Sequence, residues 1–95
     1  MTDERTARVA ELLRETESAH GAYEQEELGG ERDEQWAQWY ADHLVQGELP
    51  DALGSAPGAE RVAEVLTEAT AEHESEGSEA EWPEFAAARV VERLG

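Results

Sequence analysis

The chain has no cysteine, lysine, isoleucine or asparagine among its 95 residues. Without cysteine, it has neither disulfide bonds nor thiolate metal sites. It also has no run of about 20 apolar residues, the length that a membrane-spanning helix needs, and its first residues do not resemble a signal peptide. These absences predict a cytoplasmic protein that does not enter the membrane.

Positive charge is scarce as well. Seven arginines stand against 20 glutamates and four aspartates, and the formal net charge is −17 at pH 7. Residues 1–48 hold 13 acidic and 4 basic side chains and residues 49–95 hold 11 and 3, so the halves carry −9 and −8. Such a surface repels nucleic-acid phosphate and anionic lipid, and we expect it to bind neither.

Evenly spread acidic charge is tolerated best in concentrated salt. At 1 M salt the Debye length falls to about 3 Å, so repulsion between carboxylates is largely screened. The composition therefore predicts a protein adapted to high salt.

The apolar residues recur at helical spacing, and no segment alternates as a strand does. We therefore predict an all-α fold, a small antiparallel bundle of three to four helices in a single domain, residues 1–95. The expected helices span about 3–27, 34–46, 59–74 and 83–94, with a short turn at 50–53 and a mobile acidic linker at 75–81. Asp33 and Gly47 are the expected caps of the second helix.

Two helix faces are expected from this spacing. The first helix should bury one stripe of residues: Val9, Leu12, Leu13, Thr16, His20 and Tyr23. The third should bury another stripe, with an i, i+4 row of like charges on the opposite side: Glu60, Glu64, Glu68 and Glu72. Such a row destabilises a helix in dilute buffer.

The densest group of aromatic residues lies on the second predicted helix. Trp36 and Tyr40 share one face, and Trp39 and His43 share the adjacent one. Either all four belong to the core, where they compensate for the few leucines, or some form a partner-binding patch, because Trp and Tyr dominate interface hot spots. A ligand pocket is the third alternative. Trp39 is the residue more readily expected at the surface.

The histidines suggest a metal site only weakly. Glu17, His20 and Glu24 have spacing that would place them on one helix face. In a chain this acidic, however, a histidine between glutamates is expected by chance, and an up-down bundle places His20 and His73 at one end and His43 at the other. We predict no metal, no cofactor and no catalytic residues, since neither a phosphate loop nor a nucleophile motif is present.

One stretch resembles a family of short, uncharacterised prokaryotic helical proteins. The resemblance covers residues 12–46 and rests on a His-x-x-Tyr-Glu motif at His20, followed by Asp-x-x-Trp-x-x-Trp-Tyr-Ala from Asp33. It implies a small helical fold in which His20, Tyr23, Trp36 and Tyr40 lie where the first two helices meet. It implies no activity and no functional residues.

Together these observations predict a small, acidic, non-catalytic protein-interaction module adapted to high salt, with a protein partner or a second copy of itself. The alternative is a DNA mimic, whose carboxylates imitate phosphates and block a nucleic-acid-binding protein. A mimic should concentrate its carboxylates in rows on one face.

Overall fold

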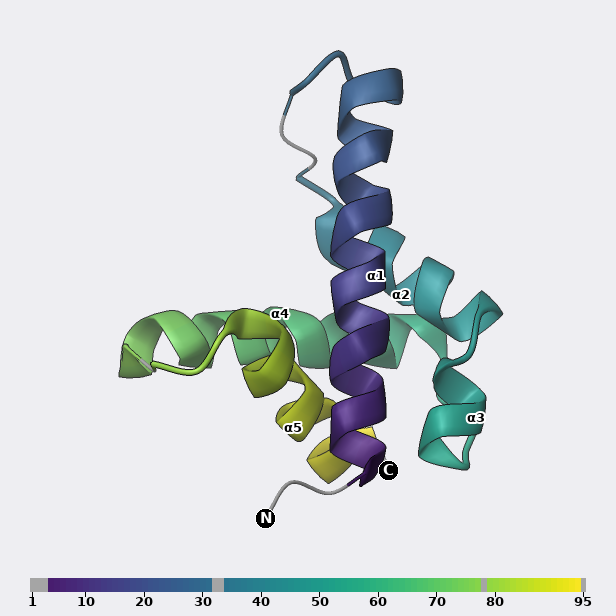
Figure 1. Ribbon diagram of the computed structural model, residues 1–95, viewed down its shortest axis with the longest axis vertical. Coiled ribbons are helices and arrows are strands. Elements are labelled where there is room, and N and C mark those ends of the chain that lie inside the picture. The colour runs from purple at the N-terminus through teal and green to yellow at the C-terminus, as the bar shows by residue number, and fades with distance from the viewer. Residues whose placement is uncertain (1–3, 32–33, 78, 95) are drawn as a thin grey trace.

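The computed structural model describes residues 4–31, 34–77 and 79–94, in which helices are joined by short turns and loops and no strand occurs (Figure 1). The predicted all-α class is therefore confirmed. In chain order the helices are α1 (Glu4–Glu27), α2 (Trp36–Gln46), α3 (Leu49–Leu53), α4 (Ala59–Glu76) and α5 (Trp82–Leu94).

The helix ends differ from the predicted ones by two residues at most. α2 begins at Trp36 after Gln35, and the predicted N-cap Asp33 lies outside the described residues. α4 continues to Glu76, so it includes the first two residues of the predicted linker, and Ser78 within that linker is also outside the described residues. The expected short turn at 50–53 is the one-turn helix α3.

The helices are not all aligned. Figure 1 shows α4 running across α1, an arrangement that the spacing of apolar residues did not predict. α1 packs against α2, α3 and α5, while α4 packs against α2 and α5. The long helix α1 therefore contacts most of the other helices, and its C-terminal half lies against α2.

Two consecutive glycines end α1. Gly29 and Gly30 have φ angles of +64° and +89°, which residues with a Cβ rarely adopt. The carbonyl of Glu24 accepts hydrogen bonds from the Leu28 amide at 3.2 Å and from the Gly30 amide at 2.8 Å, which close the last turn of α1.

The core consists of small and medium aliphatic side chains. The predicted stripe of α1 is confirmed: Val9, Leu12, Leu13, Thr16 and His20 are buried, and Tyr23 is half-buried. Ala86 and Ala87 of α5 are fully buried. Such small side chains let two helix backbones approach closely, which suits the extensive packing of α1 on α5. The fully buried side chains of most volume are Leu13, Leu49, Leu66, Val9, Val62, Val65, Val90 and Thr16.

Arginines join α4 to α5. Arg89 donates to Glu72 at 3.0 Å, and Arg93 approaches the same carboxylate at 2.8 Å. Arg93 also lies 3.5 Å from Glu68, and the Arg89 guanidinium sits 4.7 Å from the ring centroid of Phe85. The predicted row of uncompensated like charges on the far side of α4 is therefore wrong for Glu68 and Glu72, because these residues face the arginines of α5.

Two further arginines connect α1 to distant segments. Arg8 contacts Glu48, just before α3, at 2.7 Å, and Arg14 contacts Glu84 of α5 at 2.8 Å. Arg61 pairs with Glu64 within α4 at 2.9 Å.

None of the described helices is long and apolar enough to cross a membrane.

Candidate functional site

A continuous group of aromatic rings lies where α1, α2 and α5 meet. Adjacent rings in this group have centroids 5.0 to 6.2 Å apart, the range in which aromatic pairs attract each other. Its members in the described residues are His20, Tyr23, Trp36, Trp39, Tyr40, His43 and Trp82. The group therefore combines residues from both ends of the sequence.

Helical spacing explains most of this grouping. Trp36 and Tyr40 are four residues apart on α2 and meet edge to face, with centroids 5.4 Å apart at 85°. Trp39 and His43 are also four residues apart and stack nearly parallel, at 5.3 Å and 8°. His20 of α1 contacts both Trp39 and Tyr40 at 5.0 Å. The expectation that His20 and Tyr40 lie where the first two helices meet is thus met.

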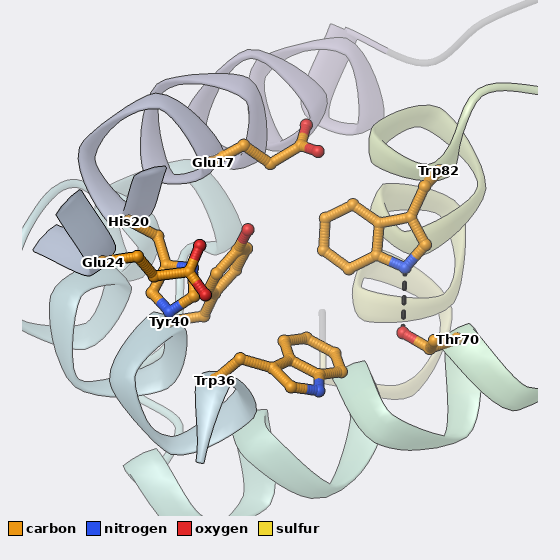
Figure 2. Close-up of a pocket in the computed structure, with 7 residues that line it drawn as sticks. All are labelled: Glu17, His20, Glu24, Trp36, Tyr40, Thr70 and Trp82. Atoms are coloured by element: carbon orange, nitrogen blue, oxygen red, sulfur yellow. Dashed lines mark hydrogen bonds and ion pairs between the residues drawn. The ribbon is translucent and has the colours of Figure 1, made fainter. Parts of the chain in front are cut away.

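One side of the group opens into a pocket of about 250 Å³ (Figure 2). We call it the aromatic pocket, and its lining residues are Glu17, His20, Glu24, Trp36, Tyr40, Thr70 and Trp82. Figure 2 shows Tyr40, Trp36 and Trp82 around an open centre, with the Glu17 side chain extending toward Trp82. Four helices therefore contribute to one small cavity.

A hydrogen-bonded threonine positions Trp82. The Thr70 hydroxyl of α4 donates to the carbonyl of Leu66 at 2.9 Å and accepts a hydrogen bond of 2.9 Å from the Trp82 indole Nε1. This arrangement satisfies the indole N–H where the ring is half-buried. The indole is held with its ring against Trp36 and Tyr40.

Negative charge and burial act on the ionisable groups of the pocket. Burial raises the pKa of Glu17, Arg14 opposes this, and Glu81 adds to it. The pKa of Tyr40 is raised to about 12 by burial and by the negative charges of Glu17 and Glu24. Both shifts have the same two causes, burial, which disfavours the charged form, and nearby negative charge.

The four partner-binding candidates differ in exposure. Tyr40 is only 8% exposed and belongs to the core, whereas Trp36 and Trp39 are half-buried and His43 is exposed. Trp36 lines the aromatic pocket. Trp39, His43 and the half-buried Tyr23 form a separate patch, which we call the outer aromatic face.

The weak metal candidates do come together, but not as a ligand set. Glu17, His20 and Glu24 all line the aromatic pocket, and His20 Nδ1 lies 3.8 Å from a Glu24 carboxylate oxygen. Among the described residues, no group of three His, Asp or Glu side chains is placed to hold a metal ion.

The expected separation of the histidines is wrong. His43 and His20 both contact Trp39, whereas His73 lies apart, 5.1 Å from Phe85 and with its Nε2 2.7 Å from the Ala80 carbonyl.

Sequence reasoning missed two lining residues, Trp82 and Thr70. Trp82 directly precedes the last predicted helix, 83–94, and Thr70 lies within the third, 59–74, but neither residue was assigned to a site. Trp82 lies beside Trp36 and Tyr40 of α2, and no periodicity encodes that contact. A large aromatic residue directly before a helix-starting proline, after a polar segment, was the available signal.

No family model matches this chain, and neither does any curated protein or solved structure. The resemblance to short prokaryotic helical proteins therefore stays a prediction.

Proposed function

We propose that the chain is a non-catalytic interaction module, adapted to concentrated salt, that binds an arginine- or lysine-rich protein segment through the outer aromatic face. The observation that carries the proposal is the parallel stack of Trp39 on the exposed His43, beside Tyr23. Trp39 and Tyr23 are half-buried, and Trp and Tyr are among the residue types that most often dominate binding energy at interfaces. The expected cytoplasmic location stays a prediction.

Charge supports a basic partner. The net charge is −17, and five arginines of the described residues form ion pairs within the chain: Arg8, Arg14, Arg61, Arg89 and Arg93. Because 24 acidic residues stand against seven arginines, most of the negative charge is left to salt cations or to a partner. Guanidinium groups stack well on aromatic rings, so an arginine-rich segment fits an aromatic patch surrounded by acids.

Binding tests the partner chemistry. We would titrate an octa-arginine peptide into the protein by calorimetry in 0.15 M NaCl. Trp39→Ala should weaken binding at least tenfold while the far-UV circular dichroism stays unchanged. Glu11→Gln, which removes one exposed charge elsewhere on α1, should weaken it less than twofold. Equal losses in both variants would show unspecific charge attraction and refute the proposal.

Self-association is the competing outcome. A dimer seen by light scattering without peptide, and lost in Trp39→Ala, would replace the basic partner by a second copy of the chain.

Salt adaptation has its own test. The melting temperature and the helical circular dichroism should both be higher in 2 M NaCl than in 0.02 M NaCl, because screening removes repulsion between carboxylates. Equal stability in both buffers would remove this part of the proposal.

The DNA-mimic alternative gains no support from the arrangement of charges. The most regular row of carboxylates lies on α4, and three of its members pair with arginines: Glu64, Glu68 and Glu72. A row that is neutralised within the molecule is a poor imitation of a phosphate backbone.

A further inference from the structure

Three walls of the aromatic pocket are rings that meet nearly at right angles. Trp36 and Tyr40 are inclined by 85°, Tyr40 and Trp82 by 85°, and Trp36 and Trp82 by 76°. Their centroids lie 5.4, 5.8 and 6.0 Å apart. The three rings thus form a corner, the arrangement in which several π faces can border one ligand (Figure 2).

The rim of this corner is acidic. Glu17 and Glu24 of α1 line the pocket, and no arginine of the described residues does. Arg14, the arginine nearest to Glu17 along α1, forms an ion pair with Glu84 of α5 at 2.8 Å. Glu24 lies 3.8 Å from His20 within the lining, and Glu17 extends toward Trp82 (Figure 2), so the pocket joins aromatic walls to an acidic rim.

Each property excludes a class of ligand. Carboxylates repel phosphates and other anions, and aromatic walls offer few oxygen ligands to a hard metal ion such as Mg²⁺ or Ca²⁺. A volume of about 250 Å³ is below the usual range for drug-sized ligands, so the pocket suits a single head group. A ligand that fits both the aromatic walls and the acidic rim is a compact cation with an apolar surface.

We propose that the aromatic pocket binds a methylated ammonium group. Its methyl groups pack on Trp36, Tyr40 and Trp82, and its charge is attracted by the negative faces of the rings and by Glu17 and Glu24. A quaternary ammonium is weakly hydrated and has no hydrogen-bond donor to satisfy, so the rings replace its water at little loss. The group belongs either to a small choline-like molecule or to a trimethylated lysine. This inference does not depend on the proposed function, which uses Trp39 and His43.

Nuclear magnetic resonance can follow the pocket directly, through the indole N–H signals of the three tryptophans. Tetramethylammonium chloride replaces NaCl at constant ionic strength during the titration. The Trp36 and Trp82 signals should move along saturable curves. Choline should bind at least tenfold more tightly than 3,3-dimethylbutanol, its uncharged isostere. Linear shifts, or equal binding of choline and the isostere, would overturn the proposal.

Matched charge variants locate the site. Glu17→Gln and Glu26→Gln each remove one charge from α1, but only Glu17 lines the pocket. We expect Glu17→Gln to weaken tetramethylammonium binding about fivefold and Glu26→Gln less than twofold. Equal weakening would mean that the cation responds only to net charge, against the proposal. Both residues are exposed, so both variants should fold.

Two ligands distinguish the sources of the group. Choline represents a free small molecule, and a short peptide with a central trimethyllysine represents a protein side chain. Tighter binding of either one assigns the source, and equal binding shows that the pocket reads the head group alone. Glycine betaine should bind more weakly than choline, because Glu17 and Glu24 repel its carboxylate. Preference for betaine would contradict the acidic rim.

Discussion

The α4–α5 pair and the meeting point of α1 with α2 accommodate glutamate side chains in different ways. Both bring glutamates close to a neighbouring helix in a chain of net charge −17. Between α4 and α5, Arg93 and Arg89 hold the pKa of Glu72 below its usual value through hydrogen bonds and charge. Beside α2, burial raises the pKa of Glu17. One carboxylate is stabilised as an anion, and the other is not.

This difference teaches how a small acidic domain divides its interactions. The α4–α5 contact adds ion pairs, which salt screens, to its buried apolar residues. The α1–α2 contact depends on rings, whose attraction hardly varies with salt. We therefore expect the two regions to respond differently to mutation and to salt.

Loss of the ring at the centre of the aromatic group should be the most damaging change. Tyr40 contacts His20, Trp36, Trp39 and Trp82 and is 8% exposed. Tyr40→Ala should lower the free energy of unfolding by about 3 kcal/mol. Urea titrations should give the same loss in 0.05 M and 2 M NaCl. A loss that halves in high salt would contradict the division between the two regions.

The phenol of Tyr40 should make stability depend on alkaline pH. Its pKa is about 12 in the folded chain and about 10 in the unfolded one, so the folded state holds the proton longer. This contribution is complete below pH 10 and is lost as the pH rises through about 12; it amounts to about 2.7 kcal/mol at most. The free energy of unfolding should therefore fall less between pH 9 and pH 11.5 in Tyr40→Phe than in the unaltered protein. Identical slopes would rule out Tyr40 as the cause.

The arginine network should show the opposite salt response. Arg89→Gln leaves Glu72 and Glu76 with less positive charge and removes the contact with Phe85. We expect the melting temperature to fall by about 4 °C in 0.05 M NaCl and by less than half as much in 2 M NaCl. Arg61→Gln, which breaks a pair within α4, is the matched control and should have a smaller effect. A loss independent of salt would assign the role of Arg89 to packing alone.

The smallest expected effect is a gain. Gly21 weakens α1 directly after His20, and a Cβ at this position would meet no atom within 4 Å. Gly21→Ala should raise the free energy of unfolding by about 0.5 kcal/mol, because it restricts the unfolded chain and favours the helix. Thermal melts in both salts should show the same small gain. Destabilisation would mean that the aromatic end needs a flexible α1.

Local patterns were sufficient to predict the helices and their buried sides. Trp36 and Tyr40, four residues apart, were expected on one face and do share the pocket. Glu17, His20 and Glu24 were expected on one helix face and line the same pocket. Spacing along a helix fixes such neighbours before any tertiary contact forms.

Contacts between distant segments were not predictable in the same way. Two features depend on how loops place whole helices, which periodicity does not encode. These are the orientation of α4 across α1 and the position of Trp82 beside α2. The row of glutamates on α4 was misjudged for the same reason: Arg89 and Arg93 reach it from another helix. Charge patterns within one helix say nothing of the charges that a neighbour brings.

The perpendicular indoles of Trp36 and Trp82 have an optical consequence. Their ring centroids are 6.0 Å apart at 76°, so their ultraviolet transitions couple strongly and split into an exciton pair. This adds a circular dichroism band unrelated to backbone conformation, and it disappears once the two rings separate. Because one ring belongs to α2 and the other to α5, the band reports the docking of these helices without any attached dye.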